Sequence, residues 1–546
     1  MLTRRNAIQT LGAAALASHP AHAAEPYLAA VRTYADNVLK HGRDVYGPKP
    51  TPLFVDGVNV DTHEPVKWVP TNGKEFVLSD LGNQQLLFRV FDGLTKLTGE
   101  AGYRQAAVDA TKYALANLRP NGFLAWGGHC AYNASDGAVF WSEDKGKSHE
   151  LKEHYPYYQL MWEMDAAATK SVIETMWNGH ILNWSNLDFN RHGTPRPMGK
   201  LWKSEYTGGE VFFWGKGLTF VNAGSDLYYA AAMLAKFTGE DGPLIWAKRL
   251  AHRYVETRNA KTGIGGYQFS QMADAWCDDV GKIRGDRAQY QFAEAFPGHR
   301  VVEGTLFPTY GEVPGVYPEI VQMHLGELLG ARGAEFTQWG IEELAAWAKS
   351  AYRASDNTFI PMLTDGTSME GFAVPKDGYF GPKGRVLKAG KARASHFWAY
   401  AMAARVSKQP AMFEMARLIA LANGFGAIDG ELNRRLGTAD PEALFGFLEL
   451  HRFSGKPMFL DAARRVGDNM LRAHFHHGFF LRSANHLYAR FDSVDALALL
   501  HLAAALAGKP AAAPPYVGTG AFFAAAYGSQ GHKYDNDILY SRMRAK

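Results

Sequence analysis

A helix-turn-helix unit recurs along this chain, and it restricts the fold more than any other feature of the sequence. Each copy ends one apolar helix at a short turn that contains Gly or Ser-Lys, as helix ends prefer, and a second helix follows. In the second helices apolar residues return at every third or fourth position, as Trp246, Leu250 and Tyr254 do. The five copies begin at Leu94, Leu234, Leu328, Ala403 and Leu450.

Repeated helical hairpins predict an all-α array, and their irregular spacing favours a closed ring over a thin solenoid. We therefore expect an α/α barrel, or toroid, of helical hairpins. Long segments rich in Gly, Pro and aromatic residues separate the hairpins, at 51–74, 119–148, 183–222, 259–315 and 355–392. Loops of this length usually serve a function, so we expect them to form a site with short strands on one rim. Because no Pro- or Ser-rich linker divides the chain, residues 24–546 are expected to form a single domain.

The first residues have the features of an export leader. Arg4 and Arg5 precede a short Ala-rich apolar stretch, and Ala21-His22-Ala23 has the small-x-small pattern of a cleavage site. We expect a twin-arginine signal over residues 1–23, with a Sec signal as the alternative, and hence a periplasmic or secreted protein.

The charge balance gives little support to a nucleic-acid or membrane-surface partner. The formal net charge of the 546 residues is +4, and no run of like charges occurs. No apolar run reaches the roughly 18 residues that a membrane span needs. Cys130 and Cys277 are the only cysteines, so one disulfide is possible but a disulfide framework is excluded.

Three stretches offer side chains suited to metal binding. His129 follows GFLAWGG, Glu150 lies in SHELKEHYPYYQL, and Arg191 and His192 stand together in FNRHGTPRP. Imidazole and carboxylate groups suit manganese, iron, cobalt, nickel or zinc. The glycine and prolines of FNRHGTPRP predict a loop rather than a helix or strand. The chain contains 20 histidines, most of which are expected to be surface or hydrogen-bonded residues, so the pattern alone indicates this site only weakly.

A second histidine cluster competes with the first. His474, His476 and His477 lie close together in AHFHHG. They follow the fifth hairpin, where a helix dipole favours cations, and no carboxylate is evident nearby in the sequence. We therefore predict that this cluster is not the metal site.

Other catalytic classes leave weaker signals. The sequence has no G-x-S-x-G nucleophile motif and no complete phosphate-binding loop. A glycosidase would use two opposed carboxylates. Asp286, Glu312 and Asp377 lie in the long segments, so the sequence leaves that class open.

Taken in order, these stretches resemble the family 2 pectate lyases, in particular the exopolygalacturonate lyases. WGGH ends at His129, HELK spans 149–152, RHG spans 191–193 and GDRAQ spans 285–289. The similarity continues in TPLFVDGVNVDTHEPVKW from Thr51, NAGSDLYYAAAML from Asn222 and DGYFGPKG from Asp377. It covers essentially the whole chain after the leader, and it departs from the family pattern at Cys130 and around 305–319.

The resemblance implies an (α/α)7 barrel and a reaction. Such enzymes cleave polygalacturonate or oligogalacturonides by β-elimination to 4,5-unsaturated products, with a transition metal, most commonly Mn²⁺, for which Co²⁺ or Ni²⁺ can stand in. By correspondence, His129, Glu150 and His192 would be the metal ligands and Arg191 the catalytic base. Lys152 and Arg287 are rim cations that we expect to contact the acidic substrate.

This chemistry suits those residue types. Removal of the proton on carbon 5 of a uronate adds negative charge to its carboxyl group, and a divalent cation on that group offsets the charge. Arginine is an unusual base because its guanidinium is ordinarily protonated. A neighbouring metal and partial desolvation would disfavour the cation.

Two other interpretations remain open at this stage. One is an α/α-barrel uronyl glycoside hydrolase with paired carboxylates and no metal. The other is an exported oligogalacturonide-binding protein whose catalytic site has decayed, although the intact His129, Glu150, Arg191 and His192 argue against decay.

Overall fold

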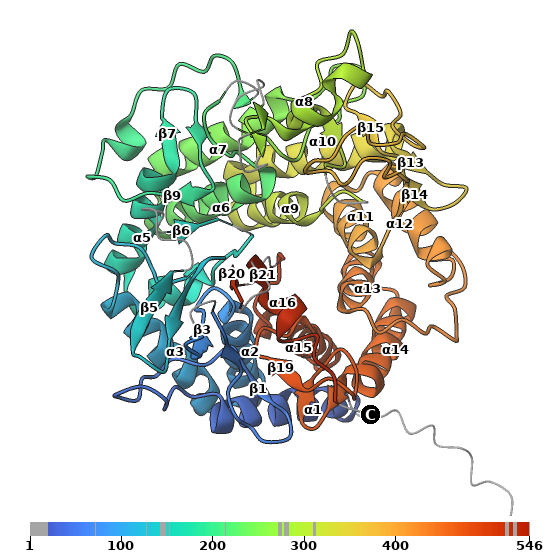
Figure 1. The fold of residues 1–546 in the computed structure, drawn as a ribbon. Helices are drawn as coiled ribbons and strands as arrows, with labels where there is room; N and C mark the ends of the chain where they lie inside the picture. Colours follow the sequence, from blue (N-terminus) through green and yellow to red (C-terminus); the bar gives the residue numbers. More distant parts are fainter. Residues whose placement is uncertain are drawn as a thin grey trace, which may run out of the picture.

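The helices of the chain form a closed ring (Figure 1). A computed structural model describes residues 20–70, 73–126, 128–141, 149–151, 153–212, 215–270, 276–277, 283–309, 313–518, 523–527 and 532–544. No helix in these ranges is both long and apolar enough to cross a bilayer. The closed ring of helices confirms the predicted all-α toroid as an α/α barrel.

The ring consists of inner helices that each pair with an outer helix. Within the described residues the inner helices are α2 (Gln85–Thr98), α4 (Tyr158–Met164), α6 (Val221–Thr238), α9 (Tyr317–Leu329), α11 (Ala394–Ser407), α13 (Pro441–Ser454) and α15 (Val494–Leu506). Their outer partners are α3 (Ala101–Ala116), α5 (Ala166–His180), α7 (Asp241–Glu256), α10 (Ala334–Ser350), α12 (Pro410–Ala422), α14 (Pro457–His474) and α1 (Pro20–His41). All five predicted hairpins are present. The α4–α5 pair and the pairing of α1 with α15 were missed.

Burial explains the difference between inner and outer helices. The inner helix α15 is apolar on all sides, and Leu497, Leu500 and Leu502 are completely buried. A helix that is apolar all round must be surrounded by other elements, as a helix on the inside of a ring is. The outer helix α14 is amphipathic and buries one face, which includes Phe459 and Val466.

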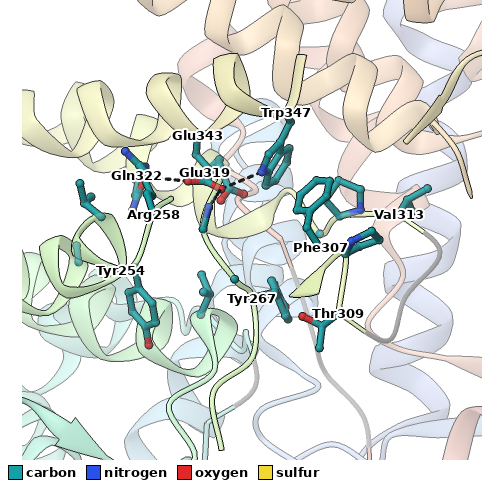
Figure 2. Close-up of a pocket in the computed structure, with 18 residues that line it drawn as sticks. Tyr254, Arg258, Tyr267, Phe307, Thr309, Val313, Glu319, Gln322, Glu343 and Trp347 are labelled. Carbon is teal, nitrogen blue, oxygen red and sulfur yellow. Dashed lines mark hydrogen bonds and ion pairs between the residues drawn. The ribbon is translucent and has the colours of Figure 1, made fainter. Parts of the chain in front are cut away.

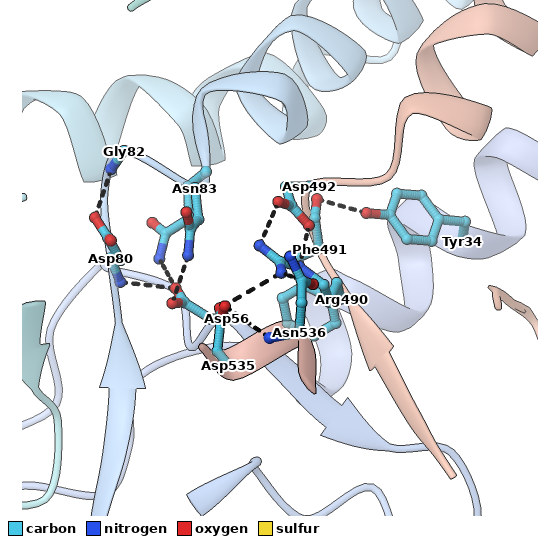
Figure 3. A network of polar contacts seen from close by, with 11 residues as sticks. Tyr34, Asp56, Asp80, Gly82, Asn83, Arg490, Phe491, Asp492, Asp535 and Asn536 are labelled. Atoms are coloured by element: carbon cyan, nitrogen blue, oxygen red, sulfur yellow. Dashed lines mark hydrogen bonds and ion pairs between the residues drawn. The ribbon is translucent and has the colours of Figure 1, made fainter. Parts of the chain in front are cut away.

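Polar contacts fasten the first part of the chain to the last (Figure 3). Asp56 accepts hydrogen bonds from the Asp80 backbone N–H at 2.7 Å and from the Asn83 side chain at 3.1 Å. Its backbone carbonyl accepts from the Phe491 N–H at 3.0 Å. The neighbouring Arg490 lies 3.4 Å from the buried carboxylate of Asp535. These bonds close the ring between the strand that follows α1 and the segment that leads into α15.

Short strands decorate the rim. Near the N-terminal half they are β1 (Gly57–Asn59), β2 (Lys67–Trp68), β3 (Phe76–Ser79), β4 (Cys130–Asn133), β5 (Ala138–Trp141), β6 (His149–Glu150), β7 (Ile181–Asn183), β8 (Asp188–Phe189) and β9 (His192–Gly193). β2, β3, β4 and β5 form one sheet in that order, and β1 pairs with β19. The prediction that FNRHGTPRP is entirely a loop was wrong. Phe189 ends β8, and His192 and Gly193 form β9, because their backbone groups pair with neighbouring strands.

The remaining strands lie mainly in the later rim segments. They are β10 (Trp276–Cys277), β11 (Ile283–Arg284), β12 (Leu306–Phe307), β13 (Tyr352–Arg353), β14 (Thr358–Phe359), β15 (Met362–Leu363), β16 (Gly390–Lys391), β17 (Phe475–His476), β18 (Phe479–Phe480), β19 (Tyr488–Arg490), β20 (Ala524–Ala526) and β21 (His532–Tyr534). The two C-terminal strands, β20 and β21, pair with each other and reach the middle of the ring, beside β6 and β9 (Figure 1). The β20–β21 hairpin therefore lies over the rim that carries the candidate site, whereas the last described residues return toward α1, where Arg544 contacts Asp61.

Candidate metal centre

A pair of two-residue strands brings Glu150 and His192 together. In the antiparallel pair β6–β9, Glu150 lies opposite His192 and His149 lies opposite Gly193. Side chains directly opposite each other in such a pair have neighbouring Cβ atoms. A further bond, from the Leu151 N–H to the Arg191 carbonyl at 2.9 Å, extends the pairing by one residue. Two segments far apart in sequence thus present a carboxylate and an imidazole to the same point.

His129 reaches this point from the residue just before β4, and the C-terminal hairpin fixes its tautomer. Its Nδ1 lies 2.7 Å from the carbonyl oxygen of Ala524 in β20. A carbonyl can only accept, so Nδ1 carries the proton and Nε2 has the lone pair. Metal-binding histidines are commonly oriented in this way by an outer hydrogen bond.

The three side chains form a compact and buried set of ligand atoms. One donor atom from each of His129, Glu150 and His192 lies within 4.8 Å of the other two. His129 Nε2 is 3.4 Å from Glu150 Oε2, and His192 Nε2 is 3.3 Å from Glu150 Oε1. The carboxylate of Glu150 is completely buried. A lone pair of His129 that faces a buried carboxylate oxygen is the arrangement that a cation between them would stabilise, so the residues fit a divalent transition metal.

Arg191 lies beside the same carboxylate. Its guanidinium Nη2 is 3.2 Å from Glu150 Oε1, and its side chain is 23% exposed. The guanidinium carbon lies 5.3 Å from the centre of the Phe220 ring. Backbone bonds hold Arg191 on both sides, from its N–H to the Leu218 carbonyl and from the Leu151 N–H to its own carbonyl. The side chain is thus anchored through its backbone, and its guanidinium lies against Glu150.

The predicted substrate contact Arg287 lies near Arg191. Its guanidinium carbon is 5.9 Å from the centre of the same Phe220 ring. It also lies 3.7 Å over the ring of Tyr379 and forms an ion pair with the buried Glu303, with Nε 2.5 Å from Oε1. Burial lowers the pKa of Arg287, but the charge and hydrogen bonds of Glu303 outweigh it and raise the pKa overall, so this side chain stays a cation. Lys152, the other predicted contact, lies outside the described residues.

Sequence reasoning missed the contribution of the C-terminal hairpin. Ala524 offers only its backbone carbonyl to His129, which no residue pattern can reveal. Tyr534 in β21 pairs with Ala524 and is 44% exposed. Burial raises the pKa of Tyr534, the charge of Arg191 lowers it, and Glu150 raises it again. The pKa of the Tyr534 hydroxyl thus depends on the charges of the site.

The second histidine cluster has a different organisation. His474, the last residue of α14, lies 2.7 Å from Asp495 through Nδ1, and this hydrogen bond raises the pKa of His474. The sequence shows no carboxylate near this cluster, and the structure supplies one from a distance, because Asp495 comes from α15 across the helix pair. His476 donates to the Ala473 carbonyl, and His477 contacts Arg544. Within the described residues, only His129, Glu150 and His192 form a group suited to a metal ion.

Two candidate acids of the hydrolase interpretation, Asp286 and Asp377, accept hydrogen bonds from backbone N–H groups. Asp286 caps α8 (Arg287–Phe292) by accepting from the Gln289 N–H and also accepts from the Glu303 N–H. Asp377 accepts from the Lys383 N–H on the surface. Glu312 lies outside the described residues. The carboxylates of Asp286 and Asp377 are therefore engaged in hydrogen bonds with backbone N–H groups.

A separate cavity of about 200 Å³ does contain two glutamates (Figure 2). Glu343 accepts hydrogen bonds from Arg258, from the Trp347 ring and from the Gly265 N–H. Burial and the neighbouring Glu343 raise the pKa of Glu319 well above its usual range. None of the ligand triad lines this cavity.

The two cysteines do not pair. Cys130 is completely buried beside His129, and burial raises its pKa to about 12. Cys277 is exposed. Neither thiol belongs to the group of three ligand atoms.

Similarity to known proteins covers most of the chain. Residues 51–526 match a protein family described as periplasmic pectate lyase. The chain is 29% identical over 537 residues to a pectate disaccharide-lyase of Dickeya dadantii (strain 3937), and the match covers 94% of this chain and 96% of that protein. Among solved structures, the chain is similar to an α-1,2-mannosidase from Trichoderma reesei, with 10% identity, a TM-score of 0.46, and coverage of 90% of this chain and 94% of the other. A D-mannose isomerase matches with 13% identity and a TM-score of 0.41 over 76% of this chain and 91% of the other.

Proposed function

This chain belongs to the family of periplasmic pectate lyases, and from that membership and the geometry of the triad we propose that it cleaves polygalacturonate or oligogalacturonides by metal-assisted β-elimination. It is a polysaccharide lyase that degrades pectate. The observation that supports the finer proposal most directly is the convergence of His129, Glu150 and His192 within 4.8 Å beside Arg191. The products would carry a 4,5-unsaturated uronate at the new end.

The metal would be held by His129 Nε2, a Glu150 oxygen and His192 Nε2. Two imidazoles and one carboxylate suit a divalent transition metal. The resemblance to the family favours Mn²⁺, with Co²⁺ or Ni²⁺ as substitutes. A cation bound there would supply Lewis-acid stabilisation of the negative charge that develops on the substrate carboxyl group. His129 is kept in the required tautomer by Ala524, and Glu150 is kept out of water by its surroundings.

Arg191 is assigned the proton abstraction at carbon 5. Its Nη2 lies 3.2 Å from Glu150 Oε1, so a sugar whose carboxyl group is bound beside Glu150 has its neighbouring C–H within reach of the guanidine nitrogens. The carbon 5–hydrogen bond breaks as its proton passes to the guanidine nitrogen, and its electrons form the 4,5 double bond. The bond from carbon 4 to the glycosidic oxygen breaks with its electron pair on that oxygen, which takes a proton from water.

Arg287 is assigned a substrate contact. Because Glu303 and Tyr379 fix its guanidinium and it shares the Phe220 ring with Arg191, it presents a permanent positive charge beside the reacting sugar. A bidentate guanidinium matches the carboxylate that each galacturonate unit carries. Lys152 remains a predicted second contact.

The hydrolase alternative has weaker support from the described residues. Its strongest acid pair is Glu319 and Glu343 (Figure 2), but three hydrogen bonds, one of them from Arg258, already hold Glu343. Such a carboxylate is poorly placed to activate water. The binding-protein alternative would require a defective site, whereas the four central side chains are present and contact one another.

One assay separates these possibilities. Polygalacturonate would be incubated with the purified protein, and ultraviolet absorbance would report unsaturated product with and without a chelator. The lyase is expected to give absorbance that the chelator abolishes and Mn²⁺ restores. New reducing ends without absorbance would indicate a hydrolase, and binding without either product would indicate a binding protein. Separation of the products by size would then distinguish release of disaccharides from internal cleavage.

Export is a further part of the proposal. The family is described as periplasmic, and Arg4, Arg5 and Ala21-His22-Ala23 predict a cleaved twin-arginine leader. N-terminal sequencing of the exported protein is expected to begin near Ala24 or Glu25. A full-length protein that stays in the cytoplasm would contradict the leader while leaving the lyase proposal intact.

A further inference from the structure

Three buried side chains form a continuous hydrogen-bonded chain directly behind the ligand triad. Trp126 Nε1 lies 2.5 Å from His149 Nε2, and His149 Nδ1 lies 2.8 Å from His180 Nε2. His180 Nδ1 lies 2.7 Å from the backbone carbonyl of Asn190. Trp126, His149 and His180 are each no more than 2% exposed.

With neutral imidazoles, only one arrangement of protons satisfies every hydrogen bond from Trp126 to Asn190. The indole N–H of Trp126 can only donate, and the carbonyl of Asn190 can only accept. His149 must therefore accept at Nε2 and donate from Nδ1, and His180 must accept at Nε2 and donate from Nδ1. Burial lowers the pKa of His180 to about 3 and that of His149 well below its usual range, in agreement with two neutral rings. A fully satisfied buried chain of this kind stiffens the structure around it.

The chain connects the three segments that carry the triad and its arginine. Trp126 lies three residues before His129, and His149 lies directly before Glu150. Asn190 lies directly before Arg191 and His192, and its side-chain oxygen accepts from the His192 N–H at 2.9 Å.

Packing reinforces the chain on both sides. The Phe123 ring stacks on His149 with centroids 5.2 Å apart and an interplanar angle of 12°. Gly193, in β9, lies so close to His180 that a Cβ on it would be 2.5 Å from Nε2. The rings thus have little room to adopt another orientation.

We propose that Trp126, His149 and His180 are positioning residues that set the spacing of the His129, Glu150 and His192 ligand atoms. Strands β6 and β9 contain only two residues each, so their ladder alone defines the geometry weakly. The hydrogen-bonded chain adds a rigid side-chain link between segments that a metal would otherwise have to draw together. The identity of the bound cation rests on the proposed function, whereas the spacing is a property of the metal-free protein.

Two substitutions of His180 test this role. Gln offers one donor and one acceptor and can keep the chain polarity, whereas Phe fills similar space and offers neither. His180→Phe is expected to weaken Mn²⁺ binding about 10–100-fold, the usual effect of losing an outer partner of a metal ligand. His180→Gln is expected to retain most of the affinity. Isothermal titration with Mn²⁺ measures both, and the visible spectrum of the Co²⁺ form reports the ligand geometry.

Trp126→Phe is a milder variant that removes only the indole N–H. It should weaken Mn²⁺ binding in the same direction if His180→Phe proves too unstable to purify. His501→Phe is the matched control, because His501 is a buried neutral histidine of α15 that bonds the Pro514 carbonyl. It should lower the melting temperature without changing Mn²⁺ affinity.

Crystal structures of the metal-free wild type and of metal-free His180→Phe complete the test. The proposal expects the ligand atoms of the variant to separate beyond 4.8 Å. Unchanged spacing together with wild-type Mn²⁺ affinity, or an affinity loss no larger than that of His501→Phe, would overturn it. If the wild type proves inactive on polygalacturonate, the proposed function fails, yet the spacing in the two structures still decides the positioning role.

Discussion

The two histidine clusters of this protein have opposite arrangements. One is dispersed in the sequence and compact in the fold, and the other is compact in the sequence and dispersed in the fold. His474, His476 and His477 lie within four positions of one another, whereas His129 and His192 lie on separate rim segments. In the folded chain the separated pair converges on Glu150, and the adjacent trio diverges to Asp495, the Ala473 carbonyl and Arg544. The density of ligand-type residues in a sequence therefore does not predict which side chains converge in the fold.

The physical reason lies in the backbone around each cluster. Glu150 and His192 are opposite each other in paired strands, and the strand pair points both side chains to one side. The C-terminal histidines follow a helix end, where neighbouring side chains point in different directions. His477 adopts a positive φ of 54°, which is uncommon for a residue other than glycine, and its ring contacts Arg544.

The largest expected effect separates Arg191 from its neighbour in the triad. Arg191→Ala leaves all three ligands in place, so bound metal should be unchanged while turnover falls by roughly 10²–10⁴-fold or more, the usual contribution of a general base. Arg191→Lys should not restore the rate, since an ammonium lacks the planar fork. Elemental analysis and product absorbance measure the two quantities. A variant that keeps more than about a tenth of the wild-type rate would exclude Arg191 as the base.

A smaller effect is expected when a ligand is removed. His192→Ala takes away one of three protein ligands, so metal content should fall after dialysis, and added Mn²⁺ should restore part of the activity. The contrast with Arg191→Ala, which excess Mn²⁺ should not help, is the decisive comparison. If His192→Ala retained wild-type metal content, the cation would have to bind elsewhere.

The packing of Gly193 provides a change of intermediate size. A Cβ at this position would lie 2.5 Å from His180 Nε2, so Gly193→Ala must displace a buried ring or β9. Overpacking of this kind typically costs about 1–3 kcal/mol of unfolding free energy. Gly437→Ala is the control, because no atom lies within 4 Å of the added Cβ. Denaturant unfolding of both variants measures the difference in unfolding free energy. Equal values would show that β9 can shift to accommodate the added Cβ at little cost.

These effects depend on features that the sequence revealed unequally. The five hairpins were predictable because apolar periodicity and turn residues are local signals, as at Gly99 and Gly239. The α4 helix was missed because it has only seven residues. The pairing of α1 with α15 was missed because it joins the two ends of the chain, and no local pattern shows which helices meet where the ring closes.

The site shows the same division. Imidazoles and carboxylates are visible in a sequence, and the resemblance to a known family selected four of them from many. Their convergence depends on pairing between distant strands, and the roles of Arg191 and the ligands remain predictions for the experiments above. The Ala524 carbonyl and the Trp126–His149–His180 chain were not predicted, because a backbone group has no signature and a buried histidine resembles any other.

A modest pH effect is expected at the C-terminal cluster. The Asp495 hydrogen bond raises the pKa of His474 above 6.5, so the protonated pair stabilises the folded chain below pH 6.5, and this contribution is lost as the pH rises through the raised pKa. Asp495→Asn should therefore lower the unfolding free energy by about 1 kcal/mol at pH 5.5 and by less at pH 8.5. Urea unfolding of both proteins at the two pH values measures this. A loss that is equal at both pH values would mean that His474 is not charged through Asp495.

The smallest effect is expected from replacing the whole C-terminal cluster, and it tests the comparison most directly. The triple variant His474→Gln, His476→Gln and His477→Gln removes every imidazole of that cluster. Each of these side chains bonds to a different partner, so the three do not converge on one point. Metal content and the rate on polygalacturonate should therefore stay close to wild type. Only the acid-side stability supplied by the charged His474 should fall, since glutamine keeps a hydrogen bond but no charge. If this variant lost its bound metal while His192→Ala kept it, the assignment of the two clusters would be reversed. The convergence of His129, Glu150 and His192 would then not indicate metal binding.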